Sequence, residues 1–149
     1  MAGSRTIEHS TTVRAPASEV VEALTSAAVL PKWFPTEAQS EPKEGGKFKL
    51  TFRGPDGNVM HVTEGKYTAV GNRGVSYTWP MDGGMGMTTV DWTLSESGGQ
   101  TNVKLVHKGF GTGGQWDEVY GMMNPGWQMF VNNLKSVLEG GADIRPKAG

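Results

Sequence analysis

A glycine-rich stretch near the end of the chain is the first candidate for chemistry. Residues 109–114 (GFGTGG) match the pattern G-x-G-x-x-G, which in dinucleotide-binding proteins cradles a pyrophosphate at the start of a helix. Such a site also needs a parallel strand–helix–strand unit and an acidic residue about 20 positions further on. Here the preceding strand is expected to form a hairpin with residues 88–97. We therefore predict a plain connection between sheet and helix, and no cofactor.

The 3 histidines are the next candidates, and the chain has no cysteine. His9, His61 and His107 lack the i, i+4 spacing that places two metal ligands on one helix face, so no metal site is predicted. His107 shares one face of a predicted strand with Val103 and Leu105. We favour a hydrogen-bonded core histidine at this position, with contact to a ligand as the alternative.

Catalytic constellations are not found in the sequence. There is no G-x-S-x-G elbow for a nucleophilic serine and no identifiable pair of carboxylates for acid–base chemistry. Glu64 lies in the middle of a predicted strand beside Gly65, and we favour an exposed carboxylate there over one that faces a cavity. No catalytic residue is assigned, and an enzymatic function is disfavoured.

Aromatic and methionine side chains give the strongest signal. They fall mostly on faces predicted to point inward, where core packing explains many of them, but an apolar wall with a few polar tips also suits a ligand pocket. Methionines at 81–87 and 122–123 suit a mouth that repacks around varied ligands. The candidate ligand-binding residues are Trp33, Tyr67, Tyr77, Trp79, Trp92, His107, Met123 and Trp127.

Strands whose side chains alternate between two faces must position these residues. Residues 5–14 alternate with period two and predict a first strand. Two short helices are expected next, over 17–25 and 27–33, the first opened by Pro16. Residues 45–110 then indicate about five antiparallel strands separated by glycine-rich turns, with a bend or bulge at Gly65.

A long helix closes the chain. Its apolar stripe includes Trp127, Phe130, Leu134 and Val137, and glycines at 140–141 end it. Because proline disrupts a helix interior, Pro125 predicts a start near residue 125, after a separate helical turn at 116–123. The fold class is therefore α+β, with a curved antiparallel sheet of about six strands around this helix.

Composition sets the broad class. The 149 residues fit one domain, which we place at 5–140 between loose ends at 1–4 and 143–149. A net charge of -1 argues against nucleic acid as the main partner. No apolar run is long enough to insert into a membrane, and residues 1–10 carry no apolar secretory segment. A cytoplasmic location is expected.

Several segments together resemble a known superfamily. Residues 10–34 (STTVRAPASEVVEALTSAAVLPKWF) resemble the opening of the SRPBCC, or START-like, superfamily. Residues 65–79 (GKYTAVGNRGVSYTW) and 88–110 (TTVDWTLSESGGQTNVKLVHKGF) resemble one branch, the homologues of the heat-shock protein 90 ATPase activator. The resemblance implies a helix-grip fold with a cavity between the sheet and the C-terminal helix.

Three functions follow as hypotheses. The first is a module that binds a small hydrophobic or amphipathic molecule in the cavity. The second is a co-chaperone-like protein that acts on a chaperone through its surface. It is weakened because the full-length eukaryotic activators carry a further domain, for which we expect this chain to be too short. The third is a cyclase- or hydrolase-like enzyme, weakened by the missing catalytic constellation.

Overall fold

A computed structural model describes residues 5–54, 56–81, 86–111 and 113–141. The ends predicted to be loose, 1–4 and 143–149, and Met85 lie outside the described residues. In chain order the elements are β1 (Arg5–Val13), α1 (Ala17–Thr25), a single 3-10 turn η1 (Leu30–Lys32), β2 (Glu37–Ser40), β3 (Lys47–Arg53), β4 (Val59–Gly71), β5 (Gly74–Met81), β6 (Gly86–Ser97), β7 (Gln100–Phe110) and α2 (Gln115–Leu138).

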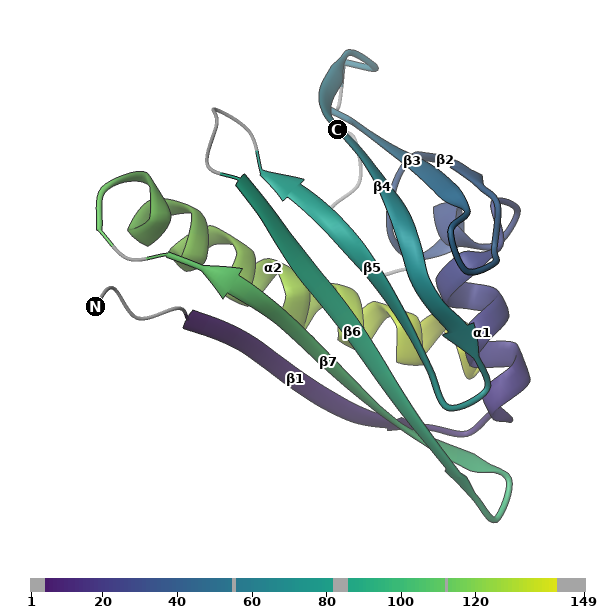
Figure 1. Ribbon diagram of the computed structural model, residues 1–149. Helices are drawn as coiled ribbons and strands as arrows, with labels where there is room; N and C mark the ends of the chain where they lie inside the picture. Colours follow the sequence, from purple (N-terminus) through teal and green to yellow (C-terminus); the bar gives the residue numbers. More distant parts are fainter. Residues whose placement is uncertain (1–4, 55, 82–85, 112, 142–149) are drawn as a thin grey trace.

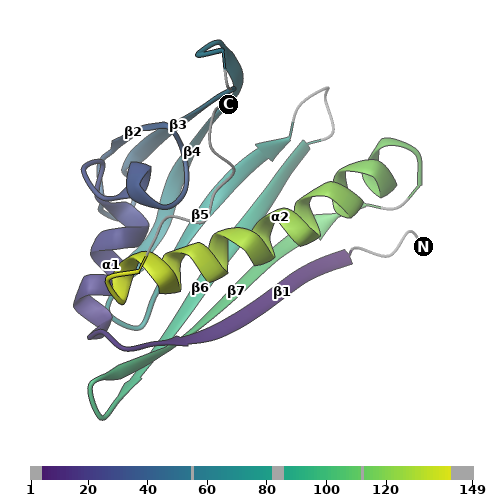
Figure 2. The same ribbon diagram turned by 180° about the vertical axis from the view of Figure 1, so that it is seen from behind.

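The described strands form one antiparallel sheet of seven, in the order β1-β7-β6-β5-β4-β3-β2. The sheet curves, and α2 runs along one face of it, with α1 beside the helix's C-terminal end (Figures 1 and 2). This arrangement confirms the predicted α+β helix-grip fold. The seventh strand is β2, whose polar sequence EAQS gives no apolar alternation and which forms by pairing with β3.

Two helical predictions were wrong. The second short helix, expected over 27–33, is only the 3-10 turn η1. The last helix does not start at Pro125 but runs unbroken from Gln115 to Leu138 through that proline. A proline inside a helix removes one backbone N–H and its ring crowds the carbonyl four residues earlier, but tertiary contacts can override this cost. Here β1 provides such contacts along the first half of α2, described next.

Polar contacts to β1 hold the first half of α2 in place. Tyr120 donates its hydroxyl to the carbonyl of Thr6 at 3.1 Å, and Nε2 of His9 lies 2.9 Å from both the backbone oxygen and Oδ1 of Asn124. Arg5 also pairs with Asp117 at 2.8 Å. These contacts keep the first half of the helix over the sheet, where it forms one wall of the site described below.

The second half of α2 is held by burial. Leu134 and Val131 lie in the core with Trp127, while Phe130 and Val137 pack against it half-buried. Asn133 is fully buried and donates Nδ2–H to the carbonyl of Trp33 at 2.9 Å. That bond holds the segment after η1 in place. The segment includes Phe34, which lies in the site described below.

Candidate functional site

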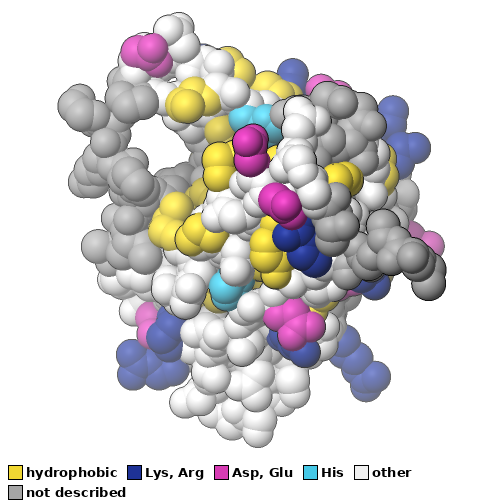
Figure 3. All heavy atoms as spheres, turned by 90° about the vertical axis from the view of Figure 1, so that its left-hand side faces the viewer, with side chains coloured by type: hydrophobic (Ala, Val, Ile, Leu, Met, Phe, Trp, Pro, Cys, Tyr) yellow, Lys and Arg dark blue, Asp and Glu magenta, His cyan; other side chains and the backbone are white. Residues whose placement is uncertain are grey.

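A cleft of about 490 Å³ opens between the first half of α2 and the inner face of the sheet. Apolar and aromatic side chains make up most of its wall. Figure 3 views the end of the molecule near this region, where hydrophobic side chains reach the surface among polar ones. The residues lining the cleft are Phe34, Phe52, His61, Trp79, Pro80, Met81, Gln115, Val119, Met122, Met123, Gly126, Trp127 and Phe130.

Phe34 organises the aromatic floor of the cleft. Its ring centre lies 4.7 Å from that of Phe130, 5.2 Å from that of Trp127 and 6.1 Å from that of Trp79. These separations fall in the range that aromatic pairs favour, and each such pair adds about 0.5–1.5 kcal/mol beyond the area it buries. Rings from η1's exit, β5 and α2 therefore form one packed surface, so the floor has a defined shape.

Few polar groups interrupt this wall. Of the described side chains that line the cleft, His61 alone is ionisable, and Gln115 adds an exposed amide at the start of α2. The imidazole of His61 is half-buried, stands 6.0 Å from the ring centre of Phe52, and has Nε2 2.8 Å from Oγ1 of Thr63. An apolar wall with one or two polar tips is typical of a small-molecule site.

His107 lies behind the wall rather than in it. It is fully buried on β7, where Nδ1 accepts the indole N–H of Trp127 at 2.9 Å and Nε2 lies 2.7 Å from Oγ1 of Thr88. The hydroxyl of Thr88 donates to the carbonyl of Trp79 at 2.7 Å. Because Nδ1 accepts and the threonine proton is already used, Nε2 carries the proton and the ring is neutral.

Burial lowers the pKa of His107 from its ordinary value of 6.5 to about 3. A protonated ring would also bring an Nδ1–H against the indole N–H of Trp127, which has no acceptor to offer. The side chain therefore stays neutral at physiological pH. It links the indole of Trp127 to the backbone of Trp79 through Thr88, and so holds two pieces of the cleft wall together.

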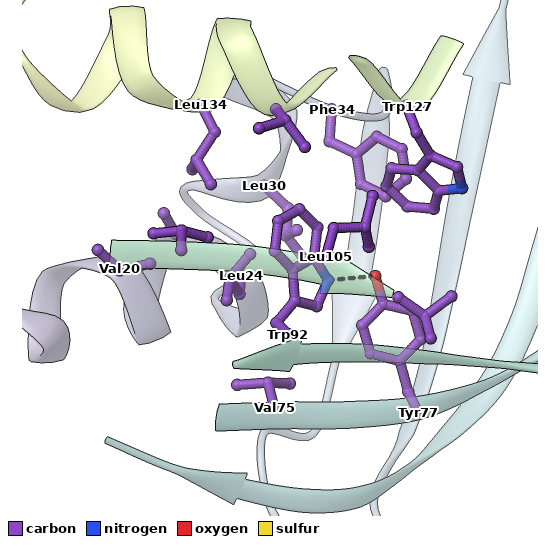
Figure 4. Close-up of a cluster of buried hydrophobic side chains, with 14 of the residues drawn as sticks. Val20, Leu24, Leu30, Phe34, Val75, Tyr77, Trp92, Leu105, Trp127 and Leu134 are labelled. Atoms are coloured by element: carbon purple, nitrogen blue, oxygen red, sulfur yellow. Dashed lines mark hydrogen bonds between the residues drawn. The ribbon is translucent and has the colours of Figure 1, made fainter. Parts of the chain in front are cut away.

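The structure brings only some of the eight candidate residues together. Trp79, Met123 and Trp127 line the cleft, while His107 stands behind Trp127. Trp92 and Tyr77 point into the core and bond to each other, the indole N–H donating to the phenol oxygen at 3.0 Å (Figure 4).

Trp33 and Tyr67 also lie in the core. Trp33 donates its indole N–H to the carbonyl of Ala23 at 2.7 Å. The hydroxyl of Tyr67 lies 2.6 Å from Oγ of Ser40. With Tyr77 they border a void of only about 10 Å³, too small for any ligand. Burial raises the pKa of both Tyr67 and Tyr77, so these phenols stay protonated.

Other residues of the cleft were not among the sequence candidates. Phe52 continues the inward alternation of Phe48 and Leu50 along β3, a signal that could have included it. His61 was considered only as a metal ligand, and within the described residues no group of three His, Asp or Glu side chains could hold a metal ion. Glu64 is exposed, as predicted, and its Oε1 lies 4.0 Å from Nζ of Lys49.

The sequence matches the family described as Activator of Hsp90 ATPase homolog 1-like protein over residues 14–139. The chain belongs to this family. The match confirms the resemblance to the heat-shock protein 90 ATPase activator branch of the SRPBCC superfamily. None of the curated proteins matches the sequence closely enough to be named as a relative.

Solved structures share the fold of this chain. A protein of unknown function from Staphylococcus aureus superposes with a TM-score of 0.78 at 19% identity, covering 93% of this chain and 96% of that one. The Aha1 dimer from Colwellia psychrerythraea superposes with a TM-score of 0.77 at 22% identity, covering 91% of this chain and 96% of that one. A protein from Mesorhizobium loti superposes with a TM-score of 0.76 at 22% identity, covering 91% of this chain and 98% of that one. At these identities the likeness concerns the fold.

No helix among the described residues combines the length and the apolar character needed to span a bilayer.

Proposed function

We propose that this family member binds a small hydrophobic or amphipathic molecule in the cleft beside α2. The observation that carries the proposal is the aromatic floor around Phe34, half-enclosed in a space of about 490 Å³. Pockets for small molecules usually have volumes of about 300–1,000 Å³ and mainly apolar walls. The larger groove on the sheet, about 850 Å³, is bordered by exposed lysine and glutamate side chains and offers no such wall.

The cleft favours a ligand that is mostly apolar and has a polar group at one end. Trp79, Trp127 and Phe130 offer ring faces and edges to an apolar body. His61 and Gln115 offer hydrogen bonds to a polar group. Met122 and Met123 are unbranched and adaptable, so they can close over ligands of different outline.

A pair of glycines on α2 allows a matched test of where ligands bind. Gly126 lines the cleft, whereas Gly121 does not, and at either position an added Cβ would meet nothing within 4 Å. Replacing glycine with leucine should stabilise the helix by about 1 kcal/mol at either position, because leucine has the higher helix propensity. Only Gly126→Leu would also fill the cleft.

The test is titration with Nile red, followed by competition with fatty acids, flavonoids and sterols. We expect Gly126→Leu to weaken dye binding at least about tenfold, because the new side chain takes the ligand's volume, while Gly121→Leu binds like the wild type. Native mass spectrometry of freshly purified protein should reveal a co-purified small molecule. Equal affinities for both variants would refute the cleft as the binding site.

Action on a chaperone is the second candidate. Family membership favours it, and Val59, Met60 and Val62 at the start of β4 are exposed apolar side chains that a protein partner would cover. We expect little or no stimulation when the protein is added to heat-shock protein 90. A several-fold rise in ATPase rate at micromolar protein, abolished by Met60→Ser, would instead favour the chaperone function over ligand binding.

A further inference from the structure

Strands β4 and β5 pair along only part of their length. Their ladder joins Gly71, Val70, Ala69 and Tyr67 of β4 to residues 74–77 of β5. Beyond it, β4 stays paired with β3 as far as Val59 and β5 stays paired with β6 as far as Met81. Figure 1 shows the two strands close at their shared hairpin and diverging toward their other ends. The sheet is therefore split over this stretch.

The direction of the backbone groups along β5 follows from its ladder with β6. Hydrogen-bonded and non-bonded pairs alternate in an antiparallel ladder. Leu94 donates its N–H to the carbonyl of Arg73 at 2.9 Å, in the same register as the β5–β6 pairs. The odd-numbered residues of β5 therefore bond to β6, and the backbone groups of Ser76, Thr78 and Pro80 face β4.

Beyond the last ladder pair, Tyr67 with Tyr77, β5 still meets β4 at Thr78 but without regular pairing. Lys66 of β4 donates its N–H to the side chain of Thr78, at 3.0 Å from Oγ1. The carbonyl of Thr78 lies against Gly65, close enough that a Cβ there would collide with it. The next position directed at β4 is Pro80, and proline has no N–H to donate. The pairing cannot continue past it in the usual pattern.

The split borders the cleft. His61 on β4 and Pro80 and Met81 on β5 flank it, and all three line the cleft. We propose that ligands enter the cleft between β4 and β5. Pro80 keeps this entrance open because it lacks the backbone N–H that would extend the β4–β5 ladder. This inference rests on the proposed binding function and assigns to Pro80 a positioning role, since it acts through the strand pairing.

Pro80→Val tests the inference because it restores the donor and adds a residue that favours strands. In stopped-flow mixing with Nile red, we expect association and dissociation rates both to fall by about tenfold, with a smaller change in Kd, as a narrowed entrance slows passage in both directions. Ser76→Val is the matched control, because it adds the same strand-favouring residue to β5 at a position that does not line the cleft and leaves the backbone donors unchanged. It should leave both rates near those of the wild type.

Amide hydrogen exchange gives a readout that needs no ligand. In Pro80→Val the new amide of residue 80 should be protected from exchange, and Pro80→Ala should show the same if the valine variant folds poorly. An unprotected amide, or unchanged dye rates in a variant with a protected amide, would overturn the entrance while leaving the binding function standing. Wild-type protein that binds no dye would instead overturn the proposed function, and the entrance with it.

Discussion

His107 shows how a single residue can matter for a site without touching a ligand. Both of its ring nitrogens are engaged, by Trp127 and Thr88, and the ring is fully buried. Its position on the inward face of β7 was predicted from alternation with Val103 and Leu105. Alternation tells which face a side chain occupies but not how deep it lies, so the sequence left a core role and a ligand contact both open.

The buried neutral ring predicts a dependence of stability on pH. The unfolded chain takes up a proton at His107 below about pH 6.5, whereas the folded chain resists this until its lowered pKa of about 3. The stabilisation is therefore complete above pH 6.5 and is lost as the pH falls toward 3, by up to about 1.4 kcal/mol per pH unit.

Urea unfolding of the wild type and of His107→Gln at pH 7, 6, 5 and 4 measures this loss. Glutamine can still accept from Trp127 and donate to Thr88 but does not titrate. We expect the free energy of unfolding of the wild type to fall more steeply with acidification than that of the variant. Parallel curves would show that His107 is not held neutral by the fold.

Among the elements, β4 shapes the sheet, because it pairs with β3 along most of its length and with β5 only near their shared hairpin. A bend or bulge was predicted at Gly65, but the register shift against β5 lies between Tyr67 and Ala69, and a second one against β3 lies between Phe52 and Arg53. Gly65 has a different role. It is the point of close approach, where the backbone of β5 and the ring of Phe48 leave no room for a side chain.

Gly65→Ala should therefore destabilise the protein. The added Cβ would lie 2.6 Å from Cζ of Phe48 and would also collide with the carbonyl of Thr78, which is backbone and cannot move aside cheaply. We expect a loss of about 1–3 kcal/mol in the free energy of unfolding. Gly71→Ala, in the same strand with nothing within 4 Å, is the control and should be neutral or slightly stabilising. Equal effects in thermal denaturation would contradict the close approach.

The other elements show what the sequence could predict and what it could not. Strands with apolar alternation, such as β3 and β6, were predicted because alternate residues are buried. The short β2 has no such pattern, since its stability comes from β3. The first half of α2 was underestimated because Pro125 and its neighbouring glycines disfavour helix locally. The cleft depends on how these segments pack, so its full lining could not be predicted.

For the whole molecule, the second half of α2 closes the core. Leu134 is fully buried, whereas Met122 on the same helix is 68% exposed. Removing buried methyl groups costs both their transfer free energy and the cavity that remains. Leu134→Ala should therefore lower the free energy of unfolding by about 2–5 kcal/mol in chemical denaturation.

Met122→Ala is the control on the same helix and should change stability by less than about 0.5 kcal/mol. A similar loss from both substitutions would mean that the helix is not anchored through Leu134. Together the two variants separate the part of α2 that holds the fold from the part that borders the cleft.

Four of the five indoles form a connected optical unit. Ring centres lie 5.9 Å apart for Trp33 and Trp92, 5.9 Å for Trp92 and Trp127, and 5.7 Å for Trp127 and Trp79. Excitation energy migrates readily between chromophores this close, so light absorbed by the core tryptophan Trp33 can be emitted from Trp79 at the cleft. A quencher in the cleft would dim the emission of buried indoles that it never touches.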